Sequence, residues 1–310
     1  MFVLIGGCSS ERATTAASVG TATSIVDSVA VTTTASSATT VARSTSTAIA
    51  TRIVENLSAA DVATALSEVE LAAAHGDGSA GPRQQLLYRY LSAHADFDDA
   101  VLANVAGDVR PSVERIVRAR QFGQARQAAN PTSSPPSSTL PAWSIVAPLS
   151  VDELLGDYHA AEDSTGIGWY WLAAINLQET RMGRIVGTSS AGAVGPMQFL
   201  PATWAHCCTG DPAIAGDAIM GAAVYLTQNG GPADMQAALH AYNPSDTYVA
   251  TVTAFAENMR DNPQLYNAYH EWQVFYSSSA GVIRLPVGYN QAQPIDAAAY
   301  LLGHPDDAAG

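Results

Sequence analysis

The segment from residue 9 to residue 52 limits where this chain of 310 residues can fold. It consists almost wholly of Ser, Thr, Ala, Val and Gly. That composition supplies too little large apolar surface to offset the conformational entropy lost on folding. We therefore predict that residues 9–52 are a disordered tether, or else a low-complexity extension without a role, and that ordered structure begins after them.

The first eight residues, MFVLIGGC, resemble the end of a bacterial lipoprotein signal, in which Cys8 would become the acylated first residue. This stub has no basic region and is shorter than the roughly 7 to 15 apolar residues of a signal core. Either the true start lies upstream or the likeness is accidental. The first reading predicts an envelope protein, anchored to the membrane through Cys8, with the tether reaching toward the wall.

Residues 53–129 are expected to form a small bundle of three or four helices. The sequence Ser58-Ala-Ala-Asp61 is typical of a helix start, and Pro111 is suited to the first turn of another helix. Apolar residues then recur at helical spacings. Arginines stand at positions 110, 115, 118, 120 and 126. We expect these arginines to form a solvated helix face and not a binding patch.

Prolines and serines dominate residues 130–142, which we interpret as a semi-rigid linker. A larger unit is expected over residues 143–272, beginning with a helix near Val151 to Ala161. Residues 273–310 are interpreted as a C-terminal extension that lines or covers this unit, with a frayed tail from Asp306.

The net charge is −14 at pH 7, and this excludes a protein that binds nucleic acid without regard to sequence, because such binding needs basic groups against phosphates. The triplet His206-Cys207-Cys208 lacks a second ligand pair at metal-binding spacing, so we predict no metal and no cofactor. A strained disulfide between the two adjacent cysteines and a pair of small buried thiols both remain open.

Glu179 closes the apolar helical run GWYWLAAINLQE, which Gly183 follows. The negative end of the helix dipole and the apolar neighbours both disfavour a charged carboxylate, so the pKa of Glu179 is expected to be raised. A raised pKa suits a general acid. Taken alone, a surface glutamate paired with Arg181 or Arg184 explains the residue better than a catalytic role does.

The segment after Glu179 favours the functional interpretation. No acidic residue occurs between Thr180 and Gly210, whereas Ser189 and Gln198 supply neutral hydrogen-bonding groups next to several glycines. Met197 adds apolar surface on which a sugar ring could rest, with Phe199 and Trp204 nearby. These features predict a loop that lets a polymer approach the backbone closely and offers hydrogen-bond donors to its hydroxyl and acetamido groups.

Four motifs in order, ETRMGR, SSAGAVGPMQFLPATW, DPAIAGDAIMGAAVYL and ALHAYNPSDTYVATV, resemble the lytic transglycosylases with a soluble-lysozyme-like catalytic domain, in particular actinobacterial cell-wall forms. The resemblance covers roughly residues 150 to 260. It implies a mainly α fold with a lysozyme-like domain, preceded by the small helical region and the tether. It also implies an extracytoplasmic enzyme whose partner is the peptidoglycan glycan strand.

The resemblance assigns the catalytic acid to Glu179 and substrate binding to Ser189, Gln198, Tyr242 and Asn243. The family often has Ala-Gly or Gly-Pro after its Tyr-Asn pair, whereas Pro-Ser-Asp follows here, which weakens the role of Asn243 more than that of Tyr242.

The count of acids bears on the reaction. Hydrolytic glycosidases normally use two carboxylates, roughly 5 to 10 Å apart. The next acid after Glu179 is Asp211, whose Asp-Pro sequence suggests a helix N-cap. The family chemistry needs one glutamate, acting as acid and then as base, and gives 1,6-anhydromuramoyl ends. Two alternatives remain open: a hydrolytic muramidase that uses a second carboxylate, and a non-catalytic wall-binding protein.

Overall fold

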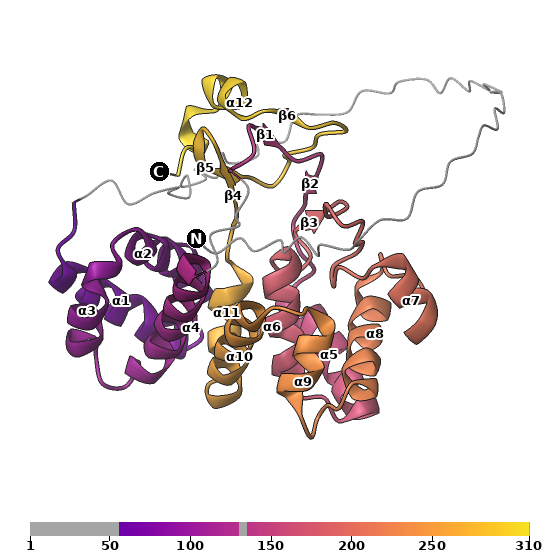
Figure 1. The fold of residues 1–310 in the computed structure, drawn as a ribbon. Helices are drawn as coiled ribbons and strands as arrows, with labels where there is room; N and C mark the ends of the chain where they lie inside the picture. The colour runs from indigo at the N-terminus through magenta and orange to yellow at the C-terminus, as the bar shows by residue number, and fades with distance from the viewer. Residues whose placement is uncertain (1–55, 130–134, 310) are drawn as a thin grey trace, which may run out of the picture. The chain divides into compact units, whose positions relative to one another are not determined.

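The protein is mainly helical, as the sequence predicts. A computed structural model describes residues 56–129 and 135–309, which belong to one compact unit (Figure 1). Within these ranges the strands are short and form three two-stranded sheets. None of the described helices is long and apolar enough to cross a membrane. The predicted lipoprotein stub, the predicted tether and the start of the predicted linker lie outside the described residues.

Four α-helices make up the N-terminal region: α1 (Ala59–Ala74), α2 (Gly81–Ala93), α3 (Asp98–Asn104) and α4 (Arg110–Ala129). The 3-10 turns η1 (Gly78–Ala80) and η2 (Ala95–Phe97) lie between them. The predicted start of the first helix is confirmed, because the Ser58 hydroxyl accepts from the Asp61 amide and the Asp61 carboxylate accepts from the Ser58 amide. Leu66, Leu87 and Val117 are fully buried where these helices meet.

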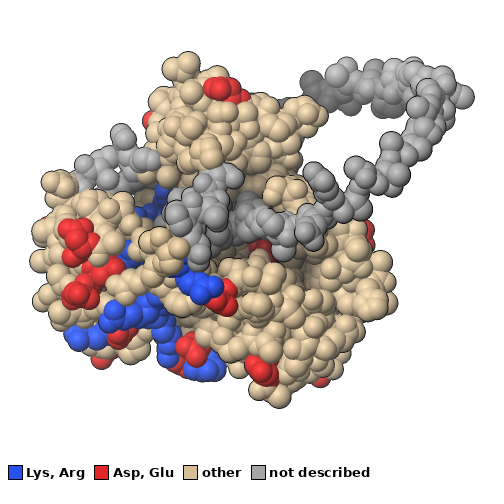
Figure 2. All heavy atoms as spheres, in the orientation of Figure 1, with Lys and Arg blue, Asp and Glu red and all other residues tan. Residues whose placement is uncertain are grey.

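The arginines of α4 do not form the single solvated face that the sequence suggested. Arg118 is exposed and pairs with Glu114 one turn earlier, but Arg120 is buried and pairs with Asp98 at the start of α3. The reason is that α4 packs against α3 on one side and against α10 (Asp246–Asp261) on another. Figure 2 accordingly shows blue arginine atoms lying among red acidic atoms at the lower left.

The N-terminal helices and the following region share one hydrophobic core. Arg115 of α4 pairs with Glu257 and Asp261 of α10, and the Asn258 amide donates to the Ser112 carbonyl at 3.1 Å. The predicted boundary near residue 142 therefore does not separate two independently packed cores.

Seven helices follow: α5 (Val151–Thr165), α6 (Trp169–Thr180), α7 (Pro201–Cys207), α8 (Ala215–Gln228), α9 (Met235–Tyr242), α10 and α11 (Leu265–His270). Helix α6 lies among α5, α8, α10 and α11 (Figure 1). All six residues from Leu172 to Leu177 are buried, because a helix that is apolar nearly all round must be enclosed by other elements. This enclosure gives the end of α6 a fixed position.

The C-terminal extension has a core of its own, which includes Leu140, Ile283 and Tyr300. It contains β4 (Val274–Ser278), β5 (Gly281–Leu285), β6 (Ile295–Asp296), α12 (Ala297–Gly303) and the 3-10 turn η3 (Pro305–Asp307). Outside the extension, β2 (Ser144–Ile145) pairs with β3 (Ile185–Val186). Strands β4 and β5 form an antiparallel hairpin.

Two sequence-based expectations fail in this extension. The predicted linker includes strand β1 (Thr139–Leu140), which pairs antiparallel with β6 because the fully buried Leu140 outweighs the flanking prolines and serines. The tail predicted to fray is held in place: Asp307 is buried, and its carboxylate accepts from Arg284 and from the Tyr300 hydroxyl, each at 2.8 Å.

Candidate active site at the end of helix α6

Helix α6 ends at Thr180, one residue after Glu179, and a strained turn follows. Arg181 and Met182 both have positive φ angles, 55° and 61°, and Gly183 follows at 83°. Positive φ is uncommon for residues other than glycine, and such strain concentrates at functional sites. The Thr180 hydroxyl fastens this turn by donating to the Pro196 carbonyl at 2.6 Å. The helix end is thus joined to the loop that the sequence associates with substrate binding.

Glu179 is partly buried in the last turn of α6. Burial raises the pKa of its carboxyl to about 7, against the opposing effects of the Tyr248 hydroxyl and of the Arg181 charge. The raised pKa predicted from the sequence therefore has desolvation as its main cause. A carboxyl group with this pKa is largely protonated in mildly acidic solution and can give up its proton near neutrality.

Two tyrosines face Glu179. Tyr242 ends α9 and Tyr248 lies in the first turn of α10, and their rings are nearly parallel with centroids 6.4 Å apart. Burial, followed by the negative charge of Glu179, raises the pKa of both phenols well above its ordinary value. Both hydroxyls therefore remain protonated and can donate hydrogen bonds.

The two hydroxyls have different partners. The Tyr242 hydroxyl donates to the Met197 carbonyl at 2.6 Å, which fixes the loop beside α9. The buried Tyr248 hydroxyl has no partner of ordinary hydrogen-bond geometry within residues 56–129 and 135–309, although it interacts with the Glu179 carboxyl. Tyr248 is not among the site residues that the sequence predicts. Its position six residues after Tyr242, at the start of the next helix, is the signal that could have found it.

Ser189 and Gln198 both stabilise the loop between them. The Ser189 hydroxyl accepts from the Ala193 amide at 3.0 Å, and the Gln198 side chain donates to the Gly195 carbonyl at 2.9 Å. Gln198 itself has a positive φ of 51°. Gly195 is required, because a Cβ atom there would lie 1.7 Å from the Pro212 carbonyl oxygen. These contacts within the loop, together with the close approach at Gly195, fix its shape.

The remaining predicted residues occupy less direct positions. The Met197 side chain is fully buried in the core, and it is its backbone carbonyl that faces Tyr242. Asn243 caps the C-terminus of α9, and its side chain makes no hydrogen bond with another described residue. Phe199 packs edge to face against Tyr225 and Tyr242, which gives the site an aromatic wall.

Arg181 and Arg89 add positive charge near the site. Burial, together with the charge of Arg89, lowers the pKa of Arg181 to about 10. Arg89 belongs to α2, and its guanidinium lies 4.2 Å from the centroid of the Phe275 ring in β4. Arg89 of the N-terminal helices is thus coupled by charge to Arg181, and Arg181 in turn lowers the pKa of Glu179.

Asp211 does not have the position that its Asp-Pro sequence suggested. It is exposed, its carboxylate accepts from the Ala213 amide at 2.9 Å, and helix α8 begins only at Ala215. Asp211 thus stabilises a turn ahead of the helix and is not the helix cap, a role that Ile214 fills. No acidic side chain within the described ranges contributes to the pKa of Glu179.

Cys207 and Cys208 form a disulfide at the end of α7, so the first of the two alternatives left open by the sequence holds. Over the described ranges, no group of three or more His, Cys, Asp or Glu is arranged to hold a metal ion.

Comparison of the chain with protein-family models, with curated proteins and with solved structures finds no match. Any function must therefore be argued from the residues around Glu179.

The pKa of Glu179 predicts a pH dependence. If Glu179 acts as the proton donor in the glycan cleavage proposed below, kcat/KM for that reaction should fall as the pH rises through about 7, approaching tenfold per unit above it. Replacing Tyr248 with Phe removes a group that lowers this pKa, so the fall should move to higher pH. Initial rates between pH 5 and 9 for both proteins test this. A fall at the same pH in both would show that Tyr248 does not act on the titrating group.

Proposed function

We propose that this protein is a peptidoglycan lytic transglycosylase with a lysozyme-like catalytic domain. The observation that carries the proposal is the partly buried Glu179 at the end of α6, with a pKa raised to about 7 and the hydroxyls of Tyr242 and Tyr248 beside it. A single carboxyl group in these surroundings suits a residue that first donates and then accepts a proton. The ordered motifs around it support a glycan substrate.

The reaction can be written with Glu179 as the only proton carrier. The protonated carboxyl donates to the oxygen that links C1 of N-acetylmuramic acid to N-acetylglucosamine, and the C1–O bond breaks. The carbonyl oxygen of the neighbouring acetamido group forms a bond to C1. The Glu179 carboxylate then removes the proton from the C6 hydroxyl, and O6 displaces the acetamido oxygen from C1. The products are a free 4-hydroxyl and a 1,6-anhydro ring, with Glu179 protonated again and no water consumed.

The surroundings of Glu179 favour this route over hydrolysis. Inverting enzymes need a second carboxylate as a base, and retaining enzymes need one as a nucleophile. The described acid that follows Glu179 in sequence, Asp211, is exposed and occupied in a turn. Intramolecular attack by the C6 hydroxyl needs neither of these groups.

The proposed setting is the cell envelope. The net charge of −14 fits recognition of wall polymer by shape and hydrogen bonding, and it does not fit binding to nucleic acid. A lipid on Cys8 and a tether over residues 9–52 would hold the folded unit near the wall. Both features lie in the part of the chain that the structure does not describe.

Product analysis tests the reaction. Purified peptidoglycan digested with the full chain is expected to yield 1,6-anhydromuramoyl ends, recognised in mass spectra because they lack one water relative to reducing ends. Reducing ends would replace the proposal with a hydrolytic muramidase, and the absence of new ends would favour a non-catalytic binding protein. The full chain is needed because the N-terminal helices and the residues after 143 share one core.

A further inference from the structure

A cavity lies at the opposite end of helix α6 from Glu179. It has a volume of about 470 Å³. Its lining residues are Val151, Asp152, Leu155, His159, Trp169, Pro263, Gln264 and Asn267. Trp169 begins α6 and Glu179 lies ten residues later, so the two are about 15 Å apart along the helix axis. The cavity is therefore separate from the proposed catalytic centre but is fixed to the same helix.

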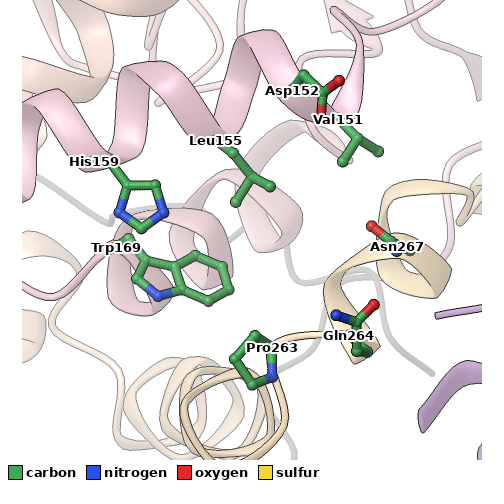
Figure 3. Close-up of a pocket in the computed structure, with 8 residues that line it drawn as sticks. All are labelled: Val151, Asp152, Leu155, His159, Trp169, Pro263, Gln264 and Asn267. Carbon is green, nitrogen blue, oxygen red and sulfur yellow. The ribbon is translucent and has the colours of Figure 1, made fainter. Parts of the chain in front are cut away.

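The lining combines aromatic and polar groups. Figure 3 shows Leu155, His159 and Trp169 on one side and the side chains of Gln264 and Asn267 across from them. Trp169 is half-buried, with its ring tilted toward His159 at a centroid distance of 5.8 Å. An indole with two amide side chains across from it, and with the Asp152 carboxyl on the helix of Leu155 and His159, suits a ligand that has an apolar face and hydroxyl or acetamido groups at its edges.

Several of the polar groups are available to a ligand. The capping box of α5 uses Glu153, so the exposed Asp152 carboxylate makes no hydrogen bond with another described residue. The Gln264 side chain also lacks a hydrogen-bond partner within the described ranges. By contrast, the Asn267 amide donates to the Gly76 carbonyl at 3.3 Å, which holds that wall in place.

The charges around the cavity favour a neutral ligand. None of its eight lining residues is an arginine, and the ring of His159 is paired through Nδ1 with Glu162 at 3.0 Å. The Asp152 carboxylate would repel an anion, and it can accept hydrogen bonds from hydroxyl or amide groups. The volume lies within the range of small-ligand sites, roughly 300 to 1,000 Å³.

We propose that this cavity is an auxiliary binding site for an uncharged N-acetylated sugar unit of the wall polymer. The inference rests on the proposed function, because it assumes that the chain acts on a glycan. When the cavity holds one part of the glycan strand, binding of the same strand at Glu179 becomes effectively intramolecular. This raises retention of the protein on the wall without a new catalytic group. Trp169 would supply the stacking surface, and Asp152 and Gln264 the hydrogen bonds.

The test uses the full chain with Glu179→Gln, so that the polymer is not degraded, and measures its sedimentation with insoluble peptidoglycan. Adding Asp152→Asn together with Gln264→Ala is expected to weaken binding by about tenfold, the loss typical of a site's principal contacts. Adding Trp169→Phe should weaken it less, because some stacking surface remains. The control adds Asp163→Asn, an exposed change on α5, the helix of Asp152, but outside the cavity. This variant should bind peptidoglycan as tightly as the Glu179→Gln parent.

A second measurement locates the contact. An N-acetylglucosamine tetramer should shift the indole N–H signal of Trp169 in nuclear magnetic resonance spectra, a signal assigned by its loss in Trp169→Phe. Equal sedimentation of all variants, or an unmoved Trp169 signal at saturating sugar, would overturn the inference. If the wild-type chain still cleaves peptidoglycan, either of these two outcomes overturns only the auxiliary site and leaves the proposed function intact. Failure of the wild type to cleave and of Glu179→Gln to sediment would overturn both.

Discussion

Replacing Glu179 with Gln is expected to reduce peptidoglycan cleavage by about a thousandfold or more. Glutamine keeps the shape of the side chain but can neither donate the proton to the glycosidic oxygen nor remove one from the C6 hydroxyl, and general acid–base groups contribute about 10²- to 10⁴-fold each. The same residue performs both steps in the proposed reaction, so both steps slow and the slower one sets the overall loss. Release of soluble muropeptides, followed by chromatography, measures it.

The same replacement should also change how the free energy of unfolding depends on pH, and measuring this dependence shows whether the variant is folded. The pKa of Glu179 is raised from about 4.5 to about 7 on folding, so the folded chain binds more protons than the unfolded chain within that window. The free energy of unfolding of the wild type therefore falls as the pH rises through it. Glutamine removes this effect. The free energy of unfolding of Glu179→Gln should therefore equal that of the wild type near pH 4 and exceed it by about 2 kcal/mol at pH 8, allowing for the partial exposure of the side chain.

Glu68→Gln is the matched control for both measurements, because Glu68 is exposed on α1 and makes no hydrogen bond with another described residue. It should retain full activity and show no comparable change in stability between pH 4 and pH 8. Substantial cleavage by Glu179→Gln, with a melting curve that shows a folded protein, would remove Glu179 from the catalytic role.

The sequence predicted the parts of the site that depend on local pattern. The apolar run before Glu179 is long enough to require a buried helix, and Gly183 marks the turn that ends it. The raised pKa of Glu179 followed from the same run. Tyr248 was not assigned to the site, because its spacing from Tyr242 alone does not separate a site tyrosine from a core tyrosine, and its role depends on how α10 packs against α6.

The sequence was also insufficient where distant segments meet. Leu140 lies within a stretch typical of linkers, yet it is fully buried because β6, far along the chain, pairs with β1. Asp307 lies near the end of the chain and is held by Arg284 of β5. Arg120 resembles its neighbours in α4, and its burial depends on tertiary contacts with Asp98 of α3 and the Leu91 carbonyl of α2. In each case a tertiary contact outweighs local composition.

Replacing Asp98 with Ala is expected to destabilise the folded chain strongly. Asp98 and Arg120 are each only 4% exposed in their side chains, and the Gln121 amide donates a further hydrogen bond to Asp98 at 2.8 Å. Alanine would leave the Arg120 guanidinium buried without its counter-charge, which typically costs about 3 to 5 kcal/mol. For a protein of this size the melting temperature should fall by about 10 °C. Urea and thermal unfolding measure both quantities.

Helix α4 supplies the matched control, because Arg118 lies two residues from Arg120 but is exposed, where it pairs with Glu114 and donates to the Gln121 side-chain oxygen at 2.9 Å. Arg118→Ala should change the free energy of unfolding by less than about 0.5 kcal/mol. Replacing both buried partners, with Asp98→Leu and Arg120→Met, should recover most of the loss, since no unpaired charge then remains in the core. If the double variant were as unstable as Asp98→Ala, the cost would come from packing around α3 and α4, and burial of an unpaired charge would not explain it.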